Sequence, residues 1–524
     1  MNRQDLIASR GDQPLRRASD RTPLGRLVGG IERAFGTGDL ELAAALLEQD
    51  PIAAWYGLRP DQLRTILTGL ERQGIPGGGF ARLMSAMFTG LDPSEIPTML
   101  SEHASADAEL HPSFLLAGQM FALRIQGRPA EALEVSARLD REYGTLEPFF
   151  GAFPGWSLFG AVQHGITAML AGDFTDAMRG FAQARMHAGI PALAFLHRDA
   201  LIKSALIEAV YGDPERAREL LAEAAGLSRT ESWAEPLVDA GGALAEALID
   251  ADEIDREDIL LRLDAIPPEA VGEMWPFHIV AVQQTLRADG RHEEGQYRLE
   301  MAERMPLPRV DGDGFTGSVL PVLGAMGALV RGDLAGAREQ LGRADASLPN
   351  TRLVAALTEL AAGNPRAALQ FVAGLSQQTR NLRRLDVWRL AITAAAHLAL
   401  GAEDQCREVL EFALELPGGL RPYEVRCFSR RVRTLAEHSF EGWPRDELDS
   451  IDGSWQFPEG GETLTARELD LLRALVSGAS REQIAKAQFI SLNTLKAHLR
   501  SIYRKLGVNS RTGAVLEAER RGLV

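Results

Sequence analysis

The chain has 524 residues and a formal net charge of −16, from 56 Lys and Arg against 72 Asp and Glu. This length exceeds what one ordinary hydrophobic core holds, so two or more units are expected. Two cysteines, Cys406 and Cys427, exclude a disulfide-rich secreted domain, and no uninterrupted apolar run is long enough to span a membrane. We therefore expect a cytoplasmic protein with free thiols and no membrane contact.

The N-terminal segment differs in composition from the rest of the chain. Residues 1–25 hold five arginines and no apolar run, which excludes a signal peptide. We predict a disordered tail over residues 1–26.

A short phrase recurs over residues 27–440. It consists of Gly, then often Asp or Asn, then Ala five residues after the Gly, and copies after Gly127 follow one another at intervals of 31 to 45 residues. A period near 40 is typical of stacked helix pairs. Clear copies begin at Gly38, Gly127, Gly172, Gly212, Gly332 and Gly363, and degenerate copies at Ala251, Gly290 and Gly401.

Each position of the phrase has a physical reason. The Gly ends the first helix of a pair in a left-handed cap, and the Asp or Asn caps the second helix. The Ala permits the two helices to cross closely. Because one helix pair cannot bury both of its faces, neighbouring pairs must stack. The sequence therefore predicts an all-α protein whose residues 27–440 form an α-solenoid.

Two aromatic segments, 149–159 and 274–278, stand at the start of first helices in a chain with only 6% aromatic residues. Aromatic side chains in a concave groove favour binding of a small molecule, peptide or protein effector. Packing between repeats is the alternative interpretation of these aromatic residues, and both interpretations stay open. The candidate ligand-binding residues are Trp156, Phe159, Trp275 and Phe277.

The solenoid is predicted to close with a charged helix over 421–438, followed by a linker over 441–461. The helix carries Arg421, Arg426, Arg430, Arg431 and Arg433, which either contact DNA or form a solvated face paired with the acidic repeats. The linker is rich in Gly and Pro.

Residues 462–524 predict four short helices. Thr465 and Glu468, like Ser480 and Gln483, have the spacing of a capping box, which begins a helix. The second helix ends only a few residues before a third that runs over 491–506, the short connection of a helix-turn-helix. Ser510 caps the fourth helix.

The third helix has two unlike faces. One is an apolar stripe at spacings of three and four residues, and the other is basic, with no Asp or Glu between residues 491 and 511. Eleven basic and six acidic residues give 462–524 a net charge of +5, so the rest of the chain carries −21. A basic surface on an acidic protein favours a nucleic-acid backbone, although an amphipathic helix with a solvated face remains the alternative. The stripe consists of Leu492, Leu495, Leu499, Ile502 and Leu506.

Residues 464–524 resemble the LuxR-type (GerE-like) DNA-binding domain. The resemblance rests on LTARE at 464–468, Ile484-Ala485, TLKAH at 494–498, IYRKL at 502–506 and Ser510-Arg511. Leu495, where the family more often has Val, and the 487–489 segment depart slightly from its pattern. The repeats resemble the tetratricopeptide-like arrays of MalT-like regulators.

This resemblance implies that the third helix enters the major groove of double-stranded promoter DNA. Lys496, Ala497 and Arg500 are then expected at base edges. A homodimer formed through the last helix, with Val515 and Ala518, implies an inverted-repeat site. The expected phosphate contacts are Ser491, Thr494, Arg504, Lys505 and Arg511.

No catalytic chemistry is predicted. The ATPase module of some large LuxR-type regulators needs a P-loop lysine, but Lys203 is the one lysine before residue 462 and follows no Gly-rich loop. No metal site or cofactor is expected, and no nucleophile and base are recognisably grouped. We expect a DNA-binding transcriptional regulator rather than an enzyme; the alternative is a helical-repeat adaptor that does not bind DNA.

Overall fold

The computed structural model of the chain is all-α, as predicted. It describes residues 22–75, 112–143, 155–187, 189–250, 256–266, 268–445, 466–488, 490–506, 510–520 and 523. Within these ranges the regular elements are α-helices and short 3-10 turns, with no strand. None of the described helices combines the length and the apolar character that crossing a membrane requires.

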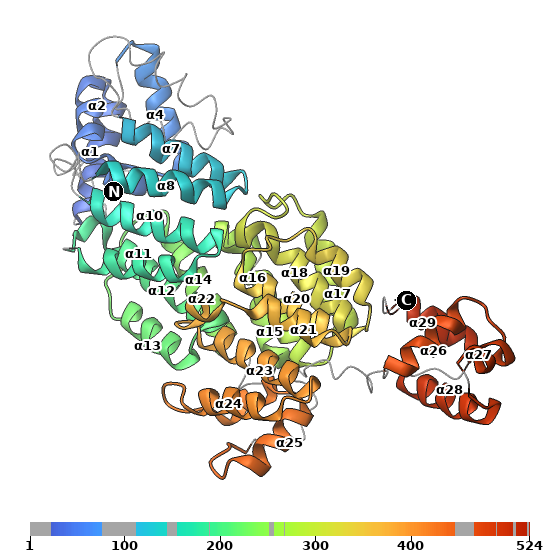
Figure 1. Cartoon of the computed structure of the whole chain (residues 1–524). Coiled ribbons are helices and arrows are strands. Elements are labelled where there is room, and N and C mark those ends of the chain that lie inside the picture. The colour runs from blue at the N-terminus through green and yellow to red at the C-terminus, as the bar shows by residue number, and fades with distance from the viewer. Residues whose placement is uncertain are drawn as a thin grey trace, which may run out of the picture.

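The N-terminal half of the array consists of antiparallel helices that follow one another along a curved stack (Figure 1). The second helix of each pair packs against the first and against the next pair. These elements are α1 (Pro23–Gly36), α2 (Leu40–Gln49), α3 (Pro51–Gly57), α4 (Pro60–Arg72), α7 (Pro112–Ile125), α8 (Pro129–Tyr143), α10 (Trp156–Ala171), α11 (Phe174–Met186), η2 (Pro191–Leu193), α12 (Ala194–Tyr211) and α13 (Pro214–Ala225).

The C-terminal half of the array continues the same pairing, with short elements inserted between pairs. Its elements are α14 (Glu235–Asp250), α15 (Arg256–Asp264), η3 (Pro268–Met274), α16 (Trp275–Ala288), α17 (His292–Arg304), α18 (Gly314–Val330), α19 (Leu334–Leu341), α20 (Pro349–Ala361), α21 (Pro365–Val372), α22 (Ser376–Thr379), α23 (Arg383–Ala399), α24 (Glu403–Leu414), η4 (Pro422–Cys427) and α25 (Arg430–Ser439).

The repeated Gly-Asp phrase forms the turn inside a pair. Gly172 has φ 94° and ends α10 in the left-handed conformation that glycine tolerates best. The next residue, Asp173, accepts a hydrogen bond from the Asp176 N–H at 2.9 Å and so caps α11. Asp39 and Asp333 cap α2 and α19 in the same way.

Two copies of the phrase differ from this prediction. Gly212 has φ −105° rather than a left-handed conformation, and a Cβ there would lie 2.9 Å from the backbone Cα of Glu208, which is closer than a side chain tolerates. Asn364 does not cap α21, because its side-chain amide instead donates to Glu359 at 2.9 Å. The Ala251 copy lies outside the described residues.

The Ala that stands five residues after the Gly lies where the two helices of a pair meet. Gly180 of α11 lies so close to α10 that an added Cβ would approach the Gly165 nitrogen to 3.0 Å. Only small side chains fit such a crossing, which is why alanine recurs there. The residues at this position are completely buried: Ala43, Ala132, Ala177, Ala217, Ala337, Ala368 and, in the last copy, Cys406.

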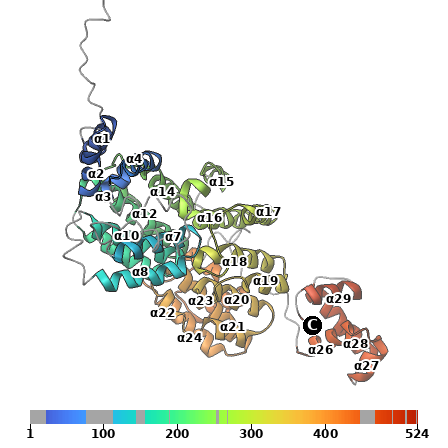
Figure 2. The ribbon, with the colours of Figure 1, turned by 90° about the horizontal axis from the view of Figure 1, so that it is seen from above.

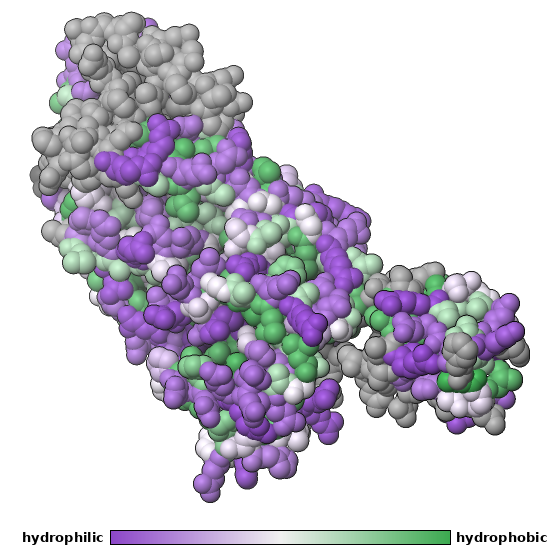
Figure 3. Space-filling model, in the orientation of Figure 1, coloured by the Kyte–Doolittle hydropathy of each residue, from purple (hydrophilic) through white to green (hydrophobic). Residues whose placement is uncertain are grey.

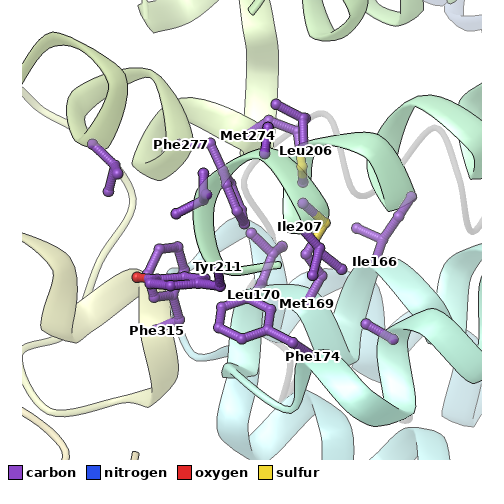
Figure 4. Packing of buried hydrophobic residues seen from close by; sticks show 14 of the residues in the cluster. Ile166, Met169, Leu170, Phe174, Leu206, Ile207, Tyr211, Met274, Phe277 and Phe315 are labelled. Atoms are coloured by element: carbon purple, nitrogen blue, oxygen red, sulfur yellow. The ribbon is translucent and has the colours of Figure 1, made fainter. Parts of the chain in front are cut away.

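The array is the predicted α-solenoid of stacked helix pairs, closed by contacts between its two halves. Helices from its two halves meet around the aromatic rings of Phe174, Tyr211, Phe277 and Phe315 (Figure 4). The ring centroids of Phe174 and Phe315 are 5.4 Å apart, and those of Phe277 and Phe315 are 5.1 Å apart. One continuous hydrophobic core therefore runs from Leu24 to Trp443.

Polar contacts across long stretches of sequence hold the two halves together. Arg421 donates to both carboxylate oxygens of Asp213, at 2.8 and 2.7 Å, although 208 residues separate them. The Asp313 carboxylate accepts from the Ala130 N–H at 2.7 Å and ties the segment before α18 to the start of α8.

Local contacts hold both ends of the array. Helix α1 begins at Pro23 because Thr22 caps it with a 2.9 Å hydrogen bond from the Gly25 N–H. At the other end, Trp443 is 5% exposed and stacks edge-on against Phe428, so the core extends into the first residues assigned to the linker. Residues 1–21 and 446–465 lie outside the described part of the chain.

Candidate nucleic-acid interface

Four helices with a core of their own form the C-terminal domain: α26 (Ala466–Val476), α27 (Arg481–Ala487), α28 (Leu492–Leu506) and α29 (Arg511–Arg520). This domain stands beside the array in two orthogonal views (Figures 1 and 2). Its core is separate from that of the array. The buried residues are Leu471, Leu472, Leu475, Ile484, Ala485, Leu495, Leu499, Ile502, Ala514 and Ala518.

Serine side chains begin the last three helices. Ser480 and Gln483 form a complete capping box, with hydrogen bonds of 3.2 and 2.7 Å. The Ser491 hydroxyl accepts from the Thr494 N–H at 3.1 Å, and that of Ser510 accepts from the Gly513 N–H at 3.0 Å. The start of α28 is therefore set by local chemistry that the sequence already contains.

Helix α28 buries one side and exposes the other. Leu495, Leu499 and Ile502 are at most 3% exposed and pack onto α26, α27 and α29. Leu492, which the sequence assigns to the same stripe, is instead 43% exposed. It is the first residue of the helix and projects beyond the core, so the prediction of its burial is wrong.

Lys496 and Arg500 lie on the exposed side of α28, one helical turn apart. Within the described part of the chain, neither forms a hydrogen bond or an ion pair. Both cations are therefore available to an external anion. Ser491 and Thr494 are also exposed, and their hydroxyls lie 2.8 Å apart at the start of the helix.

Two other arginines of the domain have structural partners. Arg467 donates to the side chain and backbone oxygens of Gln488, at 2.6 and 2.7 Å, and so holds the end of α27 against α26. One nitrogen of Arg511, Nη2, donates to the carbonyl oxygens of Leu475 and Ala479, at 3.0 and 2.9 Å. Arg511 thus satisfies backbone carbonyls at the end of α26.

The remaining predicted contacts are placed only by their backbone. Ala497, Arg504 and Lys505 belong to α28, but their side chains lie outside the described residues. Lys486 is a further exposed cation, in the last turn of α27, that the sequence reasoning did not single out. Its position in α27, the helix before the one predicted to enter the major groove, could have indicated from the sequence that it contacts DNA.

The aromatic candidates of the array lie in its interior. Trp156, Phe159, Trp275 and Phe277 are at most 4% exposed. Phe159 packs against Trp156 and Tyr56, and Phe277 belongs to the cluster of Figure 4. Their burial favours the packing interpretation that the sequence left open, because they do not line an accessible groove in this conformation.

Comparison with known proteins supports the assignment of the C-terminal domain. Residues 462–518 match the model of the luxR family of bacterial regulatory proteins. The chain is 28% identical over 162 residues to the HTH-type transcriptional regulator AlkS of Pseudomonas putida, which covers 28% of this chain and 18% of AlkS.

Two further relatives agree. A Mycobacterium bovis protein named as an HTH-type transcriptional regulator is 34% identical over 153 residues, 29% of this chain and 15% of that protein. The transcriptional regulatory protein SgaR of Hyphomicrobium methylovorum, named as probable, is 54% identical over 54 residues, 10% of this chain and 26% of SgaR. The matches thus span at most about a quarter of these relatives.

Proposed function

Since residues 462–518 form a domain of the LuxR family of bacterial regulatory proteins, we propose that the chain is a transcriptional regulator that binds promoter DNA through α28 and receives its signal through the helical array. The observation that carries this proposal is the pair of exposed, unpartnered cations, Lys496 and Arg500, on a helix whose opposite side is fixed by the domain core. A groove of duplex DNA supplies the anionic surface that such a pair requires.

The contacts divide into those that read sequence and those that position the protein. Lys496 and Arg500 donate to guanine O6 and N7, and Ala497 packs on a thymine methyl group. Ser491, Thr494, Arg504 and Lys505 bind phosphates, as does Lys486 on α27. Arg511 reaches a phosphate only with nitrogens other than Nη2, which already donates to two carbonyls.

A two-fold dimer on an inverted repeat completes the proposal. Ala518 cannot contribute to the dimer surface, because its side chain is completely buried in the domain core. Leu516 of α29 is 62% accessible and offers an apolar contact to a second copy.

Fluorescence anisotropy tests the proposal with the full chain and a labelled duplex taken from upstream of its own gene. We expect binding that weakens linearly in log–log plots as salt rises, because basic side chains release counterions from phosphates. Binding that is absent, or insensitive to salt, favours the protein-interaction adaptor instead.

A further inference from the structure

Helices α16, α17, α18 and α19 are neighbours in both views of the ribbon (Figures 1 and 2). Two adjoining pockets lie among these helices. The larger has a volume of about 230 Å³ and opens between α17, α18 and α19. The smaller lies between α16, α17 and α18. Both are lined by Gln296, Leu299 and Arg331, and Arg331 Nη1 donates to Gln296 Oε1 at 2.9 Å where they meet.

The smaller pocket is basic. Its charged lining consists of Arg287, Arg291 and Arg331, with His292 at its edge and no carboxylate. Arg291 is paired with Glu294 at 2.8 Å. Arg287 is half-buried, and among the described residues it makes no hydrogen bond and no ion pair. Burial lowers the pKa of Arg287 to about 10, so the guanidinium stays charged at neutral pH.

Arg287 is unusual in this protein. Other arginines withdrawn from solvent have carboxylate partners: Arg124 pairs with Glu273, Arg198 with Glu235, and Arg383 with Glu424 at 2.6 Å. Removing a cation from water without a counter-ion destabilises a protein. An anionic group bound beside Arg287 would provide the missing counter-ion.

The larger pocket is acidic. Glu300, Glu303, Asp333 and Glu339 line it, and its one basic lining residue is Arg331, which it shares with the basic pocket. Glu303 is neutralised in part by Arg343, at 3.2 Å, whereas Glu339 has neither a hydrogen bond nor an ion pair in the described chain. The two pockets together therefore have one positive end and one negative end.

Glycines inside the helices leave room for this groove. Gly324 and Gly327 of α18 line the acidic and the basic pocket respectively. A Cβ on Gly327 would lie 3.4 Å from Arg331 Nη1 and 3.5 Å from Gln296 Oε1, at the junction of the pockets. Glycine lowers the stability of a helix relative to alanine. The two glycines of α18 therefore leave open space in the pockets but reduce the stability of this helix.

We propose that these two pockets bind a small zwitterion whose carboxylate and ammonium group are separated by a chain of several carbons, with the carboxylate beside Arg287 and the ammonium group among Glu300, Glu303 and Glu339. The larger pocket, of about 230 Å³, suits a metabolite smaller than a drug-sized ligand, whereas the smaller pocket, of about 30 Å³, admits little more than a carboxylate group. This inference rests on the proposed role of the array as the receiver of a signal, and names the chemical class of that signal.

Thermal shift of the full chain tests the proposal. The ω-amino acids from β-alanine to aminohexanoate, and lysine, are each added at millimolar concentration, beside the amine and the carboxylic acid that lack one of the two charges. We expect at least one amino acid to raise Tm, and its two singly charged analogues to fail. No shift with any amino acid, or an equal shift with the acid alone, overturns the proposal.

Amino-acid substitutions test whether the change in Tm comes from a ligand bound in these pockets. Arg287→Gln should weaken binding of the active amino acid about tenfold or more, because a charged hydrogen bond is lost, and leave Tm of the ligand-free protein unchanged or higher. Arg380→Gln removes the same charge from an exposed site lining neither pocket and should change neither value. A lower ligand-free Tm for Arg287→Gln would show that this arginine is structural, and would overturn the proposal.

Substitution of Gly327 tests the open space at the junction of the pockets separately from the charge of Arg287. Gly327→Ala should raise the ligand-free Tm, because alanine favours the helix, and weaken ligand binding, because its methyl group occupies the junction. Gly160→Ala of α10 meets nothing within 4 Å and should raise Tm without affecting binding. Unchanged binding by Gly327→Ala would overturn the proposal. These measurements contain no DNA, so their failure is distinguishable from failure of the DNA-binding function.

Discussion

Lys496 and Arg500 differ from Arg467, Arg473 and Arg511 of the same domain, because they have no hydrogen bond or ion pair among the described residues. Arg467 and Arg511 donate to oxygens that belong to the fold, and Arg473 lies 3.5 Å from Asp470. Lys496 and Arg500 have solvent on the exposed side of α28 and no described partner. A substitution there should therefore change DNA binding and leave folding intact.

We expect Lys496→Ala to weaken binding to the promoter duplex by ~1–3 kcal/mol and to blur the preference over a scrambled duplex, as loss of a base contact does. Anisotropy titrations with both duplexes measure this. Arg504→Ala, proposed to contact phosphate, should weaken both duplexes alike and reduce the salt slope by about one. An equal loss on both duplexes for Lys496→Ala would falsify its assignment to a base edge.

A substitution of Arg511, by contrast with Lys496 and Arg500, should change the stability of the C-terminal domain. Arg511→Ala leaves the Leu475 and Ala479 carbonyls without their donor, and we expect the C-terminal domain to lose ~1–3 kcal/mol of stability. Chemical denaturation followed by circular dichroism measures the loss. Arg473→Ala removes an exposed pair and should cost no more than ~0.5 kcal/mol. Equal stability of the two variants would contradict a structural role for Arg511.

At the scale of helices, the repeated small residue decides how closely two helices of a pair approach. Ala177 of α11 is completely buried where α11 packs against α10, and Ala182 lies on the exposed side of the same helix. The hydrophilic residues that cover most of the visible face of the array lie on such outer sides (Figure 3). The same substitution should therefore have different effects at the two positions.

Ala177→Leu should destabilise the array by ~1–3 kcal/mol, because three extra carbons have no space at the crossing. Ala182→Leu adds the same atoms on the solvent side and should change stability by less than ~0.5 kcal/mol. Urea unfolding of the full chain, followed by far-ultraviolet circular dichroism, measures both values. If Ala177→Leu proved as stable as Ala182→Leu, the close crossing would not be the reason for alanine in the repeat.

At the scale of the whole molecule, the bond between Arg421 and Asp213 joins the closing segment of the array to its middle. Partial burial by itself would raise the pKa of the Asp213 carboxyl. Hydrogen bonds from Arg421 and the Glu215 N–H, together with the positive charges of Arg421 and Arg383, outweigh burial and lower the pKa below its usual value. The carboxylate therefore adds stability above the ordinary pKa of aspartate, near ~3.9. That contribution disappears as the pH falls through the lowered pKa.

Asp213→Asn keeps an oxygen to cap α13 but loses the charge that Arg421 binds. We expect a loss of about 1 kcal/mol at pH 7 that shrinks toward zero at low pH. Denaturation of both proteins across the acid range measures it. Asp404→Asn alters a carboxylate that is 95% exposed and should show almost no difference at any pH. A pH-independent loss for Asp213→Asn would mean that the charge is irrelevant to the contact.

Much of the local structure follows from the sequence because its causes lie within a few residues. The serine caps of α27, α28 and α29, the left-handed turn at Gly172 and the alanine at each helix crossing all depend on neighbours along the chain. The family of the C-terminal domain could be inferred for the same reason, since its motif is contiguous.

The features that the sequence did not reveal depend on partners distant in the chain. Leu492 follows the apolar spacing of α28 but lies past the edge of the core, and Phe277 is buried where it meets Phe174 of the other half of the array. The bonds of Arg511 to α26 and of Arg421 to Asp213 join segments 32 to 208 residues apart. Periodicity along the sequence determines which face of a helix is apolar. Tertiary packing determines which side chains that face meets. It therefore also determines which cations, such as Arg287 and Lys496, remain free for a ligand.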